Sequence, residues 1–179
     1  METENLFSSK EVSDIATAIG MDPGSDDLTG LRYNRVCILA DADVDGYHIA
    51  TLLNALFYRH FRPLVEHGHL FIAVPPLFRI DQGKDVHYAA TEQEKDELVA
   101  KLESRKGHIA VQRFKGLGEM NPEQLEQTVM SANSRSLLQV RVEDSQQAVE
   151  HMSMLLGKKN ATKRRVWMET HGDKADLET

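Results

Sequence analysis

Three aspartates at alternate positions are the residues of this sequence best suited to chemistry. They are Asp41, Asp43 and Asp45, and Gly46 follows them directly. The apolar run Val36–Leu39 precedes them, which predicts a buried strand that delivers carboxylates at its C-terminal end. Three carboxylates this close repel one another unless a cation joins them. The spacing therefore indicates a site for a hard divalent metal.

Four interpretations of this acidic loop compete. Aspartates favour a helix N-terminus, so the loop could be a polar turn that caps the next helix. An EF-hand calcium loop has the same D-x-D-x-D-G start, but its twelfth position needs a glutamate and here holds Leu52. A haloacid-dehalogenase-type phosphatase would need further acidic, Lys and Thr motifs, which do not follow in the right order. A magnesium site that handles phosphodiesters fits best, because Mg²⁺ takes one or two protein carboxylates and keeps several waters.

Basic residues form two further groups. Glycines Gly116 and Gly118 flank a basic loop with Arg113 and Lys115, in which backbone N–H groups could approach a phosphate, although such a loop can also be a plain turn. His48 lies one turn into the helix after the acidic loop, where it could reach a phosphate or make a structural contact. The densest basic cluster is either a solvated helix face or a contact with a DNA backbone or a partner protein. It comprises Lys158, Lys159, Lys163, Arg164 and Arg165.

Composition limits the class of protein. The chain has 179 residues, of which 41% are hydrophobic, enough for one core with a small second module. Its single cysteine, Cys37, indicates a reducing, cytoplasmic compartment. No segment approaches the roughly 18 apolar residues of a membrane span, so no membrane partner is expected. A net charge of -7 argues against a broadly basic surface, but a few placed Lys and Arg residues would suffice for phosphate contacts.

Hydrophobic periodicity predicts an α/β chain. A strand at 35–40, a helix at 46–67 that kinks or splits at Pro63, and a strand at 70–74 predict a βαβ crossover with a parallel sheet. Capping boxes are expected at Ser8 with Glu11 and at Thr91 with Glu94. The stripe of Phe57, Phe61 and Leu64 is expected in the core. The other predicted elements are a helix at 8–20, a hairpin of strands 77–80 and 86–89, a helix at 91–104, a strand at 110–114, a helix at 122–130, a strand at 137–142, and helices at 145–156 and 163–170.

Four motifs, taken together, resemble one family. They read DADVDGYHIATLL, GHLFIAVPPLFRI, QRFKGLGEMNPEQLEQT and KRRVWME, and they follow one another across essentially the whole chain. In this order they are similar to the TOPRIM domain and C-terminal region of the B subunits of bacterial type IIA DNA topoisomerases. The loop DPGSDDLTGLRY, and the lack of a large insertion before RFKGLGEM, look more like the topoisomerase IV branch (ParE) than the gyrase branch.

The resemblance implies a fold with two parts. Residues 1–76 would be the C-terminal part of a TOPRIM-like, Rossmann-type parallel sheet flanked by helices, and residues 77–179 a smaller α+β C-terminal tail region. The family's E-G-D-S-A and P-L-R-G-K motifs are absent from this sequence. The TOPRIM domain is therefore expected to be N-terminally truncated here, without the family's metal-binding glutamate and its ATP-binding domain. By this resemblance the isolated chain is expected to be inactive as an enzyme and not to bind ATP.

The resemblance also implies roles for residues and partners. Asp41 and Asp43 would be the principal Mg²⁺ ligands, with Asp45 as a third that acts directly or through water. The DNA-contacting residues would be Arg113, Lys115, Gly116, Gly118 and His48. The A subunit (ParC) would supply the tyrosine that attacks double-stranded DNA, within a cytoplasmic heterotetramer that breaks, passes and rejoins DNA. The alternatives are a fragment of the DNA gyrase B subunit, or a non-catalytic module that docks on the A subunit or on DNA.

Overall fold

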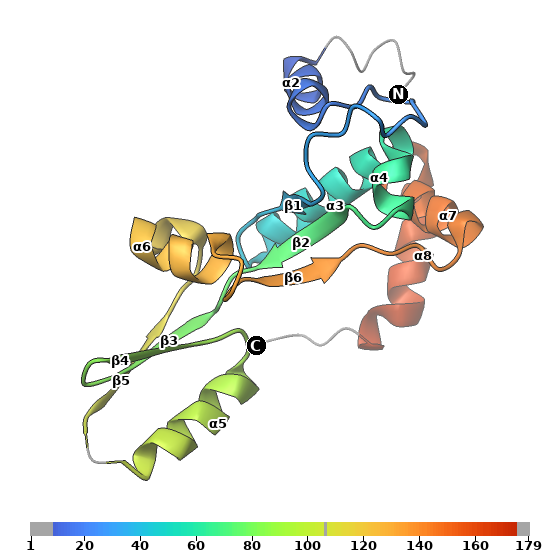
Figure 1. Cartoon of the computed structure of the whole chain (residues 1–179). Helices are drawn as coiled ribbons and strands as arrows, with labels where there is room; N and C mark the ends of the chain where they lie inside the picture. Colours follow the sequence, from blue (N-terminus) through green and yellow to red (C-terminus); the bar gives the residue numbers. More distant parts are fainter. Residues whose placement is uncertain (1–8, 106, 175–179) are drawn as a thin grey trace. The chain divides into compact units, whose positions relative to one another are not determined.

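The computed structural model describes residues 9–105 and 107–174 (Figure 1). The chain divides into two compact units, Met1–Val140 and Arg141–Thr179, and each is described by itself. Its helices are α2 (Lys10–Ile19), α3 (Val44–His60), α4 (Arg62–Glu66), α5 (Glu92–Glu103), α6 (Pro122–Leu125), α7 (Ser145–Leu156) and α8 (Ala161–His171), with 3-10 helices η1 (Leu117–Glu119), η3 (Lys158–Asn160) and η4 (Gly172–Lys174) and the π-helical turn η2 (Glu126–Met130). Its strands are β1 (Val36–Ile38), β2 (Leu70–Val74), β3 (Phe78–Gln82), β4 (Asp85–Ala89), β5 (Ile109–Arg113) and β6 (Ser136–Gln139).

The first sheet has three strands with β2 in the centre (Figure 1). β1 lies parallel to β2, with Cys37 opposite Phe71, and β6 is antiparallel to β2, with Gln139 opposite Phe71. Helices α3 and α4 connect β1 to β2, so the predicted strand–helix–strand crossover is confirmed. Only one of the two strand pairs is parallel, so the chain is mixed α/β and this sheet is not by itself a Rossmann-type parallel sheet.

The long helix splits where the sequence predicts it. α3 ends at His60, and Pro63 lies in the first turn of α4, where its missing N–H leaves no hydrogen bond unmade. The predicted core stripe is confirmed, because Phe57 is 4% exposed and Phe61 and Leu64 are fully buried. The rings of Phe57 and Phe61 pack with their centroids 5.5 Å apart. The buried end of α3 thus fixes the helix whose other end carries the acidic loop.

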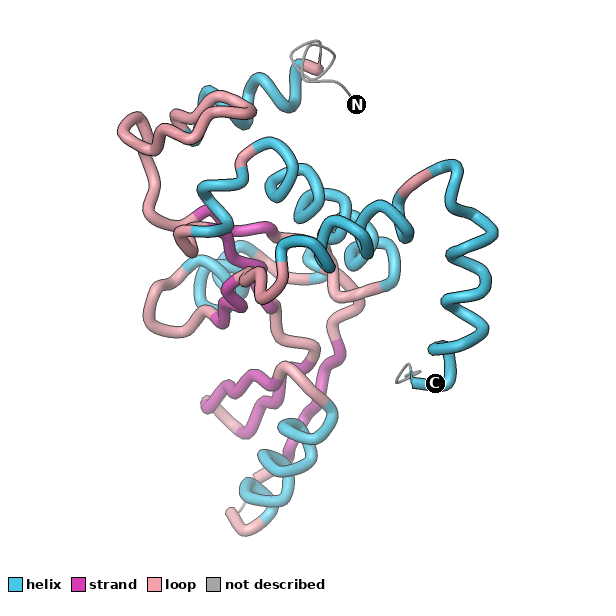
Figure 2. The backbone as a smooth tube through the Cα atoms, turned by 90° about the vertical axis from the view of Figure 1, so that its right-hand side faces the viewer, coloured by secondary structure: helices cyan, strands magenta, loops and turns pink. Residues whose placement is uncertain are grey.

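The second sheet places β3 between β4 and β5, both antiparallel to it, and α5 lies beside these strands (Figure 2). Its core consists of Phe78, Ile80, Ala89 and Leu102. The predicted hairpin is confirmed, but its turn is only the two residues 83–84. Gly83 has φ 65°, and this left-handed conformation allows a two-residue turn.

Several predicted elements are confirmed with shifted ends. α7 has the predicted bounds, and α8 begins at Ala161, before the predicted start. Pro122 opens α6, whose capping box joins Asn121 and Gln124 by bonds of 2.8 Å in both directions. The helix predicted at 122–130 continues beyond α6 as the π-helical turn η2.

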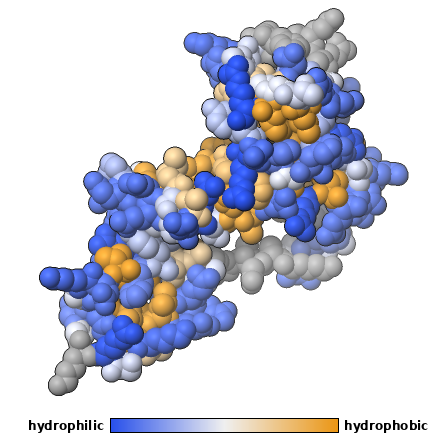
Figure 3. Space-filling model, in the orientation of Figure 1, coloured by the Kyte–Doolittle hydropathy of each residue, from blue (hydrophilic) through white to orange (hydrophobic). Residues whose placement is uncertain are grey.

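The prediction of a buried strand before the acidic loop is wrong in part. β1 has three residues, Cys37 is exposed, and Leu39 is 40% exposed. The physical reason is that successive side chains of a strand point to opposite faces, and in the described part of the chain only the face that carries Ile38 is well covered. Figure 3 shows apolar residues reaching the surface in separate patches among hydrophilic ones.

The two predicted capping boxes fare differently. Ser8 lies outside the described residues, and the N-cap of α2 is Ser9, whose hydroxyl donates to Glu11 rather than accepting from the helix. At α5, Thr91 accepts from the N–H of Glu94 at 3.1 Å as predicted. The Glu94 carboxylate, however, accepts from the N–H of Ala90 instead of that of Thr91. One half of the second box is therefore confirmed.

The predicted domains 1–76 and 77–179 stay a prediction. They refer to family domains, whereas the boundary between the two compact units falls between residues 140 and 141 of the chain. β6, from the second predicted domain, pairs with β2 from the first. In the part of the chain that the structure describes, no helix is both long enough and apolar enough to span a membrane.

Candidate functional site

The acidic loop folds tightly against the first turn of α3. Asp43 is the N-cap of this helix, and its Oδ1 accepts the backbone N–H of Gly46 at 2.7 Å. Gly46 is buried, and a Cβ at this position would lie 2.0 Å from the carbonyl oxygen of Asp41. Only glycine allows this approach, because real Cβ atoms essentially never come so close to a backbone oxygen. The D-x-x-G spacing thus fixes both the helix start and the position of the carboxylates.

Asp41 is held by the glycine loop, which lies far away in the sequence. Its Oδ1 accepts the backbone N–H of Leu117 at 2.7 Å, across a separation of 76 residues. A Cβ on Gly116 would lie 3.2 Å from Asp41 Cγ, closer than an ordinary contact. The two motifs that the sequence singled out for metal and phosphate chemistry therefore meet at Asp41.

The loop from Lys115 to Glu119, hereafter the clasp loop, is closed by its own hydrogen bonds. The N–H of Lys115 donates to Glu119 Oε2 at 2.9 Å, and the N–H of Glu119 donates to the Gly116 carbonyl at 3.1 Å. Residues Leu117–Glu119 form η1. The Glu119 side chain therefore closes this loop.

Two carboxylates can hold a hard cation at this site. Asp41 and Asp43 are exposed, and each has one oxygen bonded to a backbone N–H. Within the part of the chain described, Oδ2 of each accepts no hydrogen bond. Mg²⁺ binds through one or two carboxylates and retains waters, so this donor set fits it. Among the described residues, no group of three or more His, Cys, Asp and Glu gathers as a metal site, and Mg²⁺ ligation by Asp41, Asp43 and Asp45 stays a prediction.

The remaining predicted site residues are exposed. Asp45 and His48 lie in the first turns of α3, next to the acidic loop in sequence. Arg113 ends β5, and its guanidinium lies over the ring of Phe78, 5.9 Å from the centroid. Lys115 is exposed in the clasp loop. Their placement leaves the positive charges of Arg113 and Lys115 accessible to an anionic ligand, and their contact with DNA stays a prediction.

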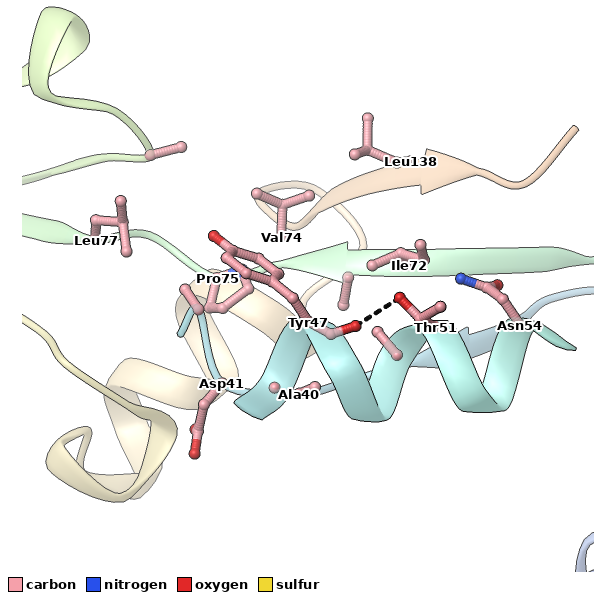
Figure 4. A pocket seen from close by; sticks show the side chains of 15 residues that line it. Ala40, Asp41, Tyr47, Thr51, Asn54, Ile72, Val74, Pro75, Leu77 and Leu138 are labelled. Carbon is pink, nitrogen blue, oxygen red and sulfur yellow. Dashed lines mark hydrogen bonds between the residues drawn. The ribbon is translucent and has the colours of Figure 1, made fainter. Parts of the chain in front are cut away.

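A cavity of about 410 Å³ runs from Asp41 along α3 towards β2 and β6 (Figure 4). Its walls are mainly apolar and include Ile72, Val74 and Leu138. Asn54 also lines it, and the buried Oδ1 of this side chain has no hydrogen-bond partner among the described residues. In Figure 4 the Asp41 carboxylate points away from Val74 and Leu138. The cavity therefore lies on the side of Asp41 opposite to its carboxylate oxygens.

The basic cluster of the second unit is only partly free. Arg164 Nη1 donates to the carbonyls of Met154 and Leu155 at 3.2 and 2.6 Å, near the C-terminus of α7. Arg165 pairs with Glu169 at 2.8 Å. Arg164 thus joins α7 to α8 by satisfying carbonyls that the helix end leaves without a partner. The lysines of the cluster, Lys158, Lys159 and Lys163, are exposed.

Comparison with known proteins finds matches in the same family that the four motifs resemble. Residues 106–169 match the family described as DNA gyrase B subunit, carboxyl terminus. The B subunit of DNA topoisomerase 4 from Escherichia coli is 54% identical over 99% of this chain and 29% of its own length, and that of Pseudomonas aeruginosa is 56% identical over 96% and 28%. The chain resembles the B subunits of bacterial type IIA topoisomerases. The DNA gyrase B subunit of Thermotoga maritima is also similar, at 44% identity over 94% of this chain and 26% of its own length.

These relatives are much longer proteins. The chain spans less than a third of their length. The relatives are topoisomerase subunits, which are isomerases, and the similarity runs through both the acidic loop and the clasp loop. The activity, substrates and partners of the whole relatives are therefore proposals for this chain.

Sequence reasoning missed how the two loops are joined. It singled out Gly46 and Gly116 as glycines beside charged residues, but it did not predict the amides that hold Asp43 and Asp41. The N–H of Gly46 could have been inferred, since an aspartate three residues before an amide is the usual N-cap spacing. The hydrogen bond from the Leu117 N–H to Asp41 could not have been inferred, because the only sign in the sequence is the glycine next to Leu117.

Proposed function

We propose that this chain is the magnesium-binding, DNA-cleavage-supporting part of the B subunit of a topoisomerase IV. In this proposal β1, α3 and β2 belong to a TOPRIM fold with a Rossmann-type sheet. The observation that supports it is the bond between Asp41 and the N–H of Leu117, because it joins the loop of the proposed metal ligands to the loop of the proposed phosphate contacts. The higher identity to topoisomerase 4 subunits than to a gyrase subunit favours the topoisomerase IV branch.

Oδ2 of Asp41 and of Asp43 would hold Mg²⁺, with Asp45 contributing through water. The bound ion would supply Lewis acidity at a phosphodiester oxygen and stabilise the charge of a departing alkoxide. The backbone N–H groups of Gly46 and Leu117 would keep the two carboxylates oriented, since each fixes one carboxylate oxygen. Because only two protein carboxylates hold the ion, we expect weak Mg²⁺ binding, with a dissociation constant that is roughly millimolar by analogy with low-affinity oxygen sites.

The clasp loop would contact the DNA backbone. Lys115 and Arg113 supply positive charge, and His48 would approach a phosphate from α3. Gly116 and Gly118 leave the loop backbone accessible to phosphate oxygens. A tyrosine hydroxyl of the A subunit (ParC) would attack the phosphorus while the 3′ oxygen leaves and takes up the proton, and religation reverses both bonds. ATP would act on the longer protein in a cytoplasmic heterotetramer, outside this chain.

A cation titration tests the metal site. Addition of Mg²⁺ to the chain should shift the amide resonances of residues 41–46. Asp43→Asn should abolish these shifts while it keeps the N-cap, because asparagine also caps helices. Asp85→Asn, at an exposed position of β4, is the matched control and should respond like the wild type. If the wild type shows no shifts, the chain has no metal site and only the docking alternative remains.

A cleavage assay tests the DNA contact. Lys115→Ala in the full-length B subunit, assembled with its A subunit, should slow cleavage of supercoiled DNA. Lys84→Ala, in the exposed hairpin turn, is the matched loss of one charge and should cleave at the normal rate. Normal cleavage by the Lys115 variant would contradict a role of the clasp loop at the scissile phosphate.

A further inference from the structure

The clasp loop touches the proposed metal site through a backbone amide. Leu117 donates its N–H only to Asp41 Oδ1, in the part of the chain that is described. Gly116 contributes no side chain, and a Cβ there would press on the Asp41 carboxylate at 3.2 Å. Gly118, two residues on, has nothing within 4 Å of the corresponding position. The two glycines of the K-G-L-G motif therefore have different roles: Gly116 makes room for Asp41, and Gly118 does not.

We infer that the clasp loop is the positioning element of the metal site, and that cation binding at Asp41 and the conformation of this loop are coupled. The inference rests on the proposed function and names Leu117 N–H and Gly116 as the groups that orient Asp41. A carboxylate that accepts a backbone N–H on one oxygen has a restricted torsion, so its second oxygen faces one direction. Outer-shell hydrogen bonds of this kind typically change metal affinity by about 10- to 100-fold.

The coupling works in both directions. A cation that binds better when Leu117 N–H orients Asp41 must also favour the conformation in which that bond is made. Lys115 belongs to the same loop, and its N–H is tied to Glu119. Cation binding would thus favour the loop conformation in which Lys115 is held by Glu119, next to the proposed DNA contact. Metal affinity and phosphate contact would rise together, although neither Lys115 nor Glu119 ligates the ion.

Removal of the single donor is the sharpest test. Leu117→Pro deletes the N–H, and proline suits this position because Leu117 opens η1 and Gly116 before it is extended, with φ -167° and ψ 167°. Leu117→Ala is the matched control, which removes the side chain but keeps the N–H. We expect Mg²⁺ titrations of the chain, followed by amide NMR at residues 41–46, to show about 10- to 100-fold weaker binding for Leu117→Pro. Leu117→Ala should bind like the wild type.

The two glycines give an independent test of the same contact. Gly116→Ala should weaken Mg²⁺ binding, whereas Gly118→Ala should leave the affinity unchanged, since only the first methyl group meets Asp41. Neither glycine has a positive φ, so backbone strain does not separate the two variants. In the wild type, Mg²⁺ should also shift the amide of Leu117, because its N–H is bonded to Asp41 Oδ1. Unchanged amide spectra outside residues 36–50 and 110–125 will confirm that each variant folds.

The possible outcomes are distinct. Shifts at residues 41–46 that are equally strong in the wild type, Leu117→Pro and Gly116→Ala would overturn the positioning role while the metal site stands. If the chemical shift of the Leu117 amide does not change during the wild-type titration, the coupling is overturned. If the wild type shows no shifts at 41–46, the metal site fails, and the inference fails with it. Selective weakening in Leu117→Pro and Gly116→Ala supports both.

Discussion

The two three-stranded sheets of the first unit differ in how far apart their strands lie along the chain. The second sheet and α5 come from one contiguous segment, and they enclose Phe78 and Ile80 at 3% and 0% exposure. The first sheet also has buried side chains, with Leu70 at 0% exposure, but it combines strands from residues 36 to 139. The candidate site is attached to the sheet whose strands come from distant segments. Its geometry therefore depends on a few long-range contacts, of which the Asp41–Leu117 bond is one.

The largest effect should separate the two sheets directly. Ile80 and Ile72 occupy the central strands β3 and β2, but Ile80 is fully buried, whereas Ile72 is half-buried beside the cavity. Ile80→Ala should destabilise its sheet by about 2–5 kcal/mol, because the tightly packed neighbours cannot move in to fill the cavity that the smaller side chain leaves. Ile72→Ala should cost clearly less. Amide hydrogen exchange in β3 and β2 measures each loss locally, and equal losses would break the comparison.

A smaller effect is expected at the start of α3. Gly46→Ala would place a methyl group against the Asp41 carbonyl oxygen, 2.0 Å away in the present backbone. The loop must move, with a cost of about 1–3 kcal/mol, as for other overpacked sites. Thermal unfolding followed by circular dichroism measures this cost. Gly118→Ala, with open space around its Cβ, is the control and should unfold at the wild-type temperature.

Two helix caps sharpen the comparison further. Asp43 caps α3 beside the site, and Asp144 caps α7 in the second unit through the N–H of Gln147 at 2.9 Å. Alanine at either position should cost about 0.5–2 kcal/mol of stability, measured by urea unfolding. Only Asp43→Ala should also lose the Mg²⁺ response. A Mg²⁺ response that survives in Asp43→Ala would separate the cap from the proposed ligand.

The smallest effect is pH-dependent and belongs to the end of α3. Burial, followed by the nearby charge of Arg59, lowers the pKa of His60 below its ordinary value of 6.5. A lowered histidine pKa means that the folded state favours the neutral ring, so stability is complete above pH 6.5 and declines as pH falls below it. His60→Gln should make thermal unfolding less sensitive to pH in this range. An unchanged pH profile in the variant would assign the dependence to other groups.

Prediction from the sequence succeeded where the signal was local. The split of the long helix at Pro63, the strand at Leu70–Val74 and the bounds of α7 all follow from periodicity, capping residues or proline over short distances. It failed where burial depends on the packing of other elements: the apolar run predicts burial throughout, but Ile38 is buried while Cys37, on the other face of β1, is exposed. It also could not say that Arg164, within a basic cluster, is committed to the carbonyls of α7.

The sequence by itself determined the chemistry available here and its local geometry. Alternating aspartates, the D-x-x-G spacing and the glycines after Lys115 specify carboxylates at a helix start and a basic turn, because caps and turns arise within three or four residues. Only the tertiary structure decided that the two loops meet. A bond between Asp41 and Leu117 spans 76 residues, and such closure depends on how intervening strands pair rather than on any local preference. The sequence thus supplies the three aspartates, and the tertiary structure bonds one of them, Asp41, to the clasp loop.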